Sequence, residues 1–64
     1  MTPEQIQSLL RQYGVTQKSL AEKCGVSTMM VSLVIHGKSV SRRVMLEIAI
    51  AIKKKPSVVY PDHF

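Results

Sequence analysis

Apolar residues recur along this chain at intervals of three and four positions, which is the period of a helix that is buried on one side. The clearest stripe lies near the beginning and consists of Ile6, Leu9, Leu10 and Tyr13, which we expect to face the core. Thr or Ser precedes most of these stripes, where its side chain can cap the first turn, and Gly follows several of them. Stripes and caps together predict a compact all-α fold with five helices, at about residues 3–13, 17–24, 28–36, 42–54 and 57–60.

The second and third predicted helices form the most distinctive stretch, which covers residues 17–37. Ala21 is small enough for two helices to pass closely, and Gly25 stands where a left-handed backbone can end the first of them. Ser27 can then cap the next helix. Two helices joined by a turn of about three to four residues that contains Gly are typical of a helix-turn-helix, whose second helix reads DNA. The sequence therefore predicts a helix-turn-helix at residues 17–37.

The charge of the chain is unevenly distributed and favours a polyanionic partner. A length of 64 residues predicts one domain, residues 1–64, with a net charge of +5. Residues 36–55 contain six of the nine Lys and Arg residues and only one carboxylate, Glu47. Such a field favours nucleic acid over a membrane surface, because no basic amphipathic helix with bulky aromatic residues accompanies it. The alternative is that the cations only keep a small domain soluble.

Several classes of function lack support in the sequence. No apolar run approaches the roughly 20 residues of a membrane span, no signal peptide is visible, and Cys24 has no second Cys to pair with. A cytoplasmic protein is therefore expected. No cluster of His, Cys, Asp and Glu has metal-ligand spacing, and neither a Gly-rich phosphate loop nor a nucleophile beside a base is present. We expect no enzymatic activity, no metal, no cofactor and no small-molecule ligand.

The predicted helix-turn-helix resembles that of the lambda repressor and Cro-like family of bacterial and phage regulators. The residues that match in order and spacing are Gln17, Ala21, Gly25-Val26-Ser27, Val31-Ser32 and Gly37. The resemblance extends over about residues 1–60 and implies a small transcriptional regulator that binds double-stranded DNA with its third helix in the major groove. One such module buries only about 600–1,000 Å² on DNA, which favours a homodimer on two half-sites.

The resemblance also implies which residues contact DNA. Helical spacing turns Val31, Val34 and Ile35 toward the core and leaves the opposite side of the third helix free. By the resemblance, the base-contacting residues are Met29, Ser32 and Leu33 on that free side and Thr28 at its flank. The phosphate-contacting residues are Gln17, Lys18, His36, Lys38, Arg42 and Arg43. If His36 lies against a phosphate, binding should strengthen as the pH falls and the imidazole gains a proton.

The sequence departs from the family at the centre of the reading face. Members often carry Gln, Arg or Lys at the positions of Met29 and Leu33, whereas Met and Leu can only pack against apolar groups such as thymine methyls. Two interpretations follow, of which we prefer the first: recognition through thymine methyls and DNA shape, or a face that binds protein. A protein-binding module on the same fold, such as an antitoxin or a repressor-inactivating adaptor, would use Met29, Leu33 and the apolar C-terminal residues.

The C-terminal residues are more apolar than a free tail should be. The apolar side chains in question are Val58, Val59, Tyr60 and Phe64. They are expected either to close the core or to form a two-fold dimer contact. The run Lys53-Lys54-Lys55 suits the C-terminus of the fourth predicted helix, because cations there interact favourably with the helix dipole.

Overall fold

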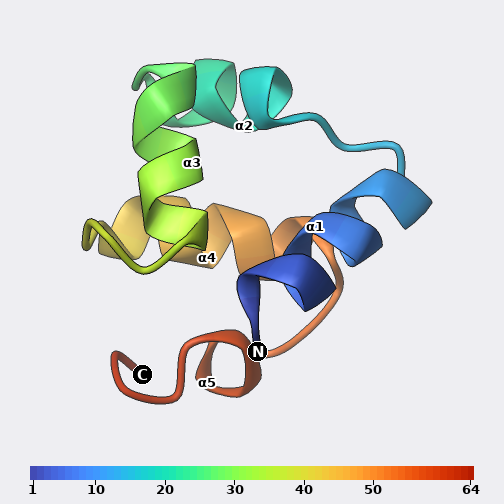
Figure 1. Ribbon diagram of the computed structural model, residues 1–64, viewed down its shortest axis with the longest axis vertical. Coiled ribbons are helices and arrows are strands. Elements are labelled where there is room, and N and C mark those ends of the chain that lie inside the picture. The colour runs from blue at the N-terminus through green and yellow to red at the C-terminus, as the bar shows by residue number, and fades with distance from the viewer.

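The computed structural model describes residues 1–64 and contains five α-helices and no β-strand. The helices are α1 (Pro3–Gln12), α2 (Gln17–Cys24), α3 (Thr28–Ile35), α4 (Arg42–Ala51) and α5 (Pro56–Val59). Helix α4 contacts α2, α3 and α5, while α1 contacts α3 (Figure 1). The predicted all-α fold with five helices is confirmed.

The core consists of fourteen buried side chains, all of them hydrophobic. Helix α4 contributes more of them than any other helix, namely Val44, Met45, Ile48 and Ala49, and Ile52 follows at its end. A helix that is apolar over such a wide arc must lie at the centre of a small fold, which is where α4 lies between its neighbours. Tyr13 was expected in the first buried stripe. It instead lies at the surface, just after the last residue of α1, and is 41% exposed.

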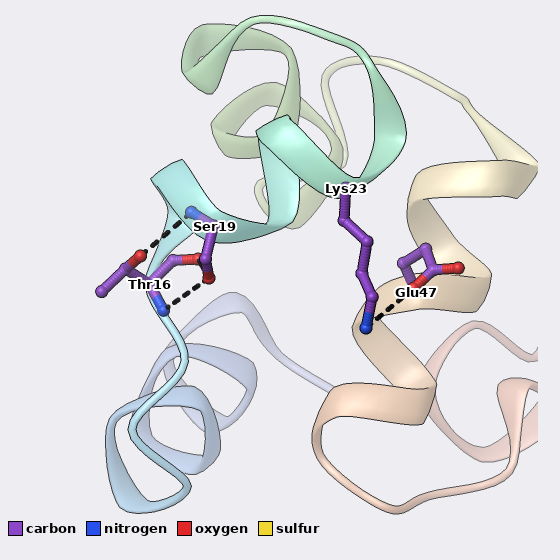
Figure 2. A network of polar contacts seen from close by, with 4 residues as sticks. All are labelled: Thr16, Ser19, Lys23 and Glu47. Carbon is purple, nitrogen blue, oxygen red and sulfur yellow. Dashed lines mark hydrogen bonds and ion pairs between the residues drawn. The ribbon is translucent and has the colours of Figure 1, made fainter.

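Each of the first four helices begins with a side-chain cap. The hydroxyls of Thr2, Thr16, Ser27 and Ser41 accept hydrogen bonds from the backbone N–H three residues further on. At α2 the bond is reciprocal: the Ser19 N–H donates to the Thr16 hydroxyl at 3.0 Å, and the Thr16 N–H donates to the Ser19 hydroxyl at 3.3 Å (Figure 2). These bonds satisfy N–H groups that have no partner inside the helix, and they fix the start of α2.

The first four helices also end alike, in a backbone reversal through a left-handed residue. After α2 this residue is Gly25, with φ of 69°, and the Val26 N–H donates to the Ala21 carbonyl at 3.0 Å. After α4 the same position is occupied by Lys53, with φ of 57°, and the Lys54 N–H donates to the Ala49 carbonyl at 3.0 Å.

The reversal at Lys53 corrects the predicted end of the fourth helix. The helix ends at Ala51 and not at residue 54, so the three lysines lie beyond it in an exposed connection. The prediction failed there because no Gly marks the reversal. The first and third helices end one residue earlier than predicted, and α5 begins and ends one residue earlier. None of the helices is long and apolar enough to cross a membrane.

Candidate nucleic-acid interface

The candidate interface is built on the pair α2 and α3, which pack together through buried apolar side chains. Leu20, Ala21 and Cys24 of α2 and Val31 and Val34 of α3 are all buried in the same cluster. Ala21, the smallest of these side chains, is 3% exposed. The turn between them is fixed at both ends, because Gly25 ends α2 and the Ser27 hydroxyl accepts the Met30 N–H at 3.1 Å. The pair therefore holds α3 with one side in the core and the other at the surface.

The outer side of α3 carries the residues expected to contact bases, but they differ in exposure. Thr28 and Met29 are exposed, and Met29 is 71% accessible. Ser32 and Leu33 are only half-buried. Leu33 was expected on the exposed side of the helix together with Met29, but its side chain is partly covered. Met29 is therefore the one large apolar side chain of α3 that is exposed.

His36 caps the end of α3 and presents one defined ring nitrogen to the surface. Its Nδ1 atom lies 2.9 Å from the Ser32 carbonyl oxygen. A carbonyl oxygen can only accept a hydrogen bond, so Nδ1 carries a hydrogen and donates it. The second nitrogen, Nε2, is therefore free in an exposed ring. It accepts a hydrogen bond when the ring is neutral and donates one when the ring is charged.

Exposed cations follow the end of α3. Lys38, Arg42 and Arg43 all have exposed side chains, and no carboxylate pairs with any of them. The ion pair in the structure lies elsewhere, between Lys23 Nζ of α2 and Glu47 Oε2 of α4 at 3.8 Å (Figure 2). The charge of the α3–α4 connection is thus not neutralised by the protein itself and is available to an anionic partner.

The start of α2 forms a second candidate contact with an anion. Gln17 and Lys18 occupy its first turn, where backbone N–H groups point outward; Lys18 is exposed and Gln17 half-buried. Gln17 also borders a shallow cavity of about 290 Å³, whose other lining residues are Gln7, Leu10, Arg11, Val15 and Thr16. Arg11 was not among the expected contact residues, because nothing in its local sequence places the exposed end of α1 beside the start of α2.

The C-terminal residues divide between the core and the surface. Val59 is 1% exposed and closes the core, so it has no surface to offer to a dimer contact, whereas Val58 is 51% exposed. Tyr60 and Phe64 are half-buried against the core. The Tyr60 hydroxyl is buried without a hydrogen-bond partner, and burial raises the pKa of Tyr60 to about 12.

Two contacts between cations and aromatic rings were not expected from the sequence. The Arg42 guanidinium lies over the Phe64 ring, 4.6 Å from its centroid, and the Lys53 ammonium lies 5.3 Å from the centroid of the Tyr13 ring. Both pairs join residues far apart in the chain, so no local signal in the sequence could have revealed them. No group of three or more His, Cys, Asp and Glu side chains is placed to hold a metal ion.

Comparison with known proteins agrees with this geometry. A family model described as helix-turn-helix matches residues 6–59, which is most of the chain. No curated protein and no solved structure gave a match. The matched segment contains the capped α2, the turn at Gly25 and the whole of α3. The chain therefore belongs to the helix-turn-helix family of lambda repressor and Cro-like type and is a DNA-binding domain.

Proposed function

We propose that this protein is a small transcriptional regulator, of bacterial or phage type, that binds a specific double-stranded DNA site with α3 in the major groove. The observation that carries the proposal is the position of Met29, 71% exposed on the outer side of a helix whose inner side is fixed in the core. A major groove admits one helix, and residues on the outer side then meet the edges of the bases.

Bases are read by Thr28, Met29, Ser32 and Leu33 in this proposal. The Thr28 and Ser32 hydroxyls can donate or accept hydrogen bonds, whereas Met29 packs against thymine methyl groups. Leu33 is half-buried, so it offers less surface than Met29 does. Because none of the four makes a bidentate contact with a base, sequence preference also depends on the shape of the DNA.

Phosphates are held on both sides of the reading helix. Gln17 and Lys18 contribute at the start of α2, where unpaired N–H groups already attract an anion. His36, Lys38, Arg42 and Arg43 contribute at the end of α3 and the start of α4. These contacts set the position of α3 along the duplex and supply most of the affinity, but they do not distinguish one sequence from another.

Regulation follows from occupancy of the site, since bound protein blocks or recruits polymerase. A homodimer on two half-sites about one helical turn apart provides useful specificity, because a single module of this size buries little surface on DNA. Val58, Tyr60 and Phe64 remain candidates for the dimer contact. Val59 is not proposed for that contact, because it is 1% exposed.

The test is selection of bound duplexes from a random pool at moderate salt. An enriched palindrome rich in thymine at the positions facing Met29 is the expected result, and the enriched bases should change in Met29→Gln, since a Gln side chain can bond adenine bidentately. A pool that remains random after repeated selection would refute sequence-specific binding.

The salt dependence of affinity distinguishes this function from the protein-binding alternative. Arg43→Ala should weaken binding to every duplex alike. It should also reduce the magnitude of the slope of log affinity against log salt concentration by about 0.9, the contribution of one phosphate contact. Lys23→Ala is the matched control, because it removes the same charge from a side chain that pairs with Glu47. It should leave the slope unchanged. A protein-binding module, with Met29 as its main exposed anchor on α3, should show little salt-dependent affinity for any duplex.

A further inference from the structure

Arg42, the first residue of α4, contacts the aromatic ring of Phe64, the last residue of the sequence. Arg42 is exposed, and its guanidinium carbon lies 4.6 Å from the centroid of the Phe64 ring. A cation within about 6 Å of an aromatic centroid is attracted to the negative face of the ring. No carboxylate pairs with Arg42, so Phe64 is the group in the protein that restrains its charged end.

Phe64 itself is held in place by the fold. The chain leaves α5, makes a turn in which the His63 N–H donates to the Tyr60 carbonyl at 3.1 Å, and brings Phe64 back against the core. Figure 1 shows this last segment returning from α5 toward the side of the molecule on which α4 begins. The ring is half-buried, so one part packs on the protein while the guanidinium covers another.

Contact with the ring leaves the guanidinium able to bind an anion at the same time. The group is planar and delocalised, so it packs on an aromatic ring through its face and directs its N–H groups outward in the plane, as a fork that fits a phosphate. A free Arg side chain loses much of its rotamer freedom when it binds a phosphate. An Arg already held against a ring has lost part of that freedom beforehand. Arg43, the next residue, is exposed and has no such support.

We infer that Phe64 is a positioning residue of the DNA interface, which holds Arg42 in the orientation that binds a backbone phosphate. The inference rests on the proposed function and adds to it a role for the C-terminal residue. For this role Phe64 need not touch DNA, because it acts on the phosphate through Arg42.

The experiment measures duplex affinity for two substitutions of Phe64 in the full chain. Phe64→Leu keeps an apolar side chain but removes the aromatic face, whereas Phe64→Tyr keeps the face. Phe64→Leu should weaken binding about two- to fivefold, and Phe64→Tyr should bind as tightly as the unaltered protein. Thermal unfolding of both variants, followed by circular dichroism, establishes that they are folded at the temperature of the binding assay.

A second pair of variants separates positioning from a general effect on the fold. In an Arg42→Gln background, Phe64→Leu should cause no further loss of affinity, because the group that the ring holds is gone. In the matched Arg43→Gln background, Phe64→Leu should still cause its full loss. Equal losses in both backgrounds, or no loss from Phe64→Leu alone, would overturn the inference while leaving DNA binding intact. An unaltered protein without salt-dependent duplex affinity would instead defeat the proposed function and this inference with it.

Discussion

Lys53 adopts a backbone conformation that is costly for any residue other than Gly. Its φ of 57° is the only positive value among the non-glycine residues, whereas the equivalent position after α2 is Gly25. The left-handed conformation costs an L-residue about 1–2 kcal/mol, because Cβ crowds the backbone. A contact of the Lys53 side chain offsets part of this strain. Its ammonium lies 5.3 Å from the centroid of the exposed Tyr13 ring, and such a contact stabilises the fold by about 0.5 kcal/mol.

Substitution by Ala and by Gly separates these two contributions. Both substitutions remove the contact with Tyr13, so Lys53→Ala should lower the free energy of unfolding by about 0.5 kcal/mol. Lys53→Gly also relieves the strain, but the unfolded chain gains about 0.4–1 kcal/mol of conformational freedom, which offsets part of the relief. Lys53→Gly should therefore be more stable than Lys53→Ala by about 0.5–1 kcal/mol. In a domain of this size, each 1 kcal/mol corresponds to a difference in Tm of roughly 4–8 °C.

The same pair of substitutions at Lys54 provides the matched control. Lys54 is the adjacent residue, is exposed and carries the same charge, but its φ is not positive. Only the entropy of the unfolded chain distinguishes the substitutions there, so Lys54→Gly should be less stable than Lys54→Ala by about 0.4–1 kcal/mol. Thermal and urea unfolding of the four variants measure both differences. If Gly is not the more stable choice at residue 53, the strain is not present and the reasoning is wrong.

Two other features of the fold lead to measurable changes in stability. Tyr60→Phe should stabilise the protein by about 1 kcal/mol, because it removes a buried hydroxyl that has no hydrogen-bond partner. Burial raises the pKa of Tyr60 from 10.0 to about 12, so the unfolded chain loses this proton at a lower pH than the folded protein does. The free energy of unfolding should therefore fall between pH 10 and 12. Urea unfolding should show a smaller fall in Tyr60→Phe and the full fall in the control Tyr13→Phe. Thr16→Ala should lower the free energy of unfolding by about 1 kcal/mol, because it removes the reciprocal cap of α2. The control Ser8→Ala, on the exposed side of α1, should change it by less than about 0.5 kcal/mol. Thermal unfolding measures both changes.

The elements that sequence reasoning placed correctly are those set by local signals. A Thr or Ser cap followed by apolar residues at helical spacing fixed the start of α1, α2, α3 and α4, because the bonds involved span only three residues. The predicted end of the fourth helix was wrong, because Lys53 takes a conformation that sequence patterns associate with Gly.

Features of the candidate site that depend on contacts between distant segments could not be predicted. The angular position of Leu33 placed it opposite the core, but its exposure depends on what surrounds it as well as on its own helix. The alternatives for the C-terminal residues were left open by the sequence, and only the packed structure assigns Val59 to the core. The Phe64 ring under Arg42 likewise depends on the path of the whole chain.

If α3 reads DNA as proposed, affinity and sequence specificity come from different residues. Helix α3 contains no Lys, Arg, Asp or Glu, so the reading face itself contributes little to the electrostatic attraction of a duplex. The cations lie before and after α3, and in the proposed complex they would meet phosphates rather than bases. It follows that changes on α3 should alter which sequence is preferred with little effect on the salt dependence of affinity. Changes at the flanking cations should do the reverse.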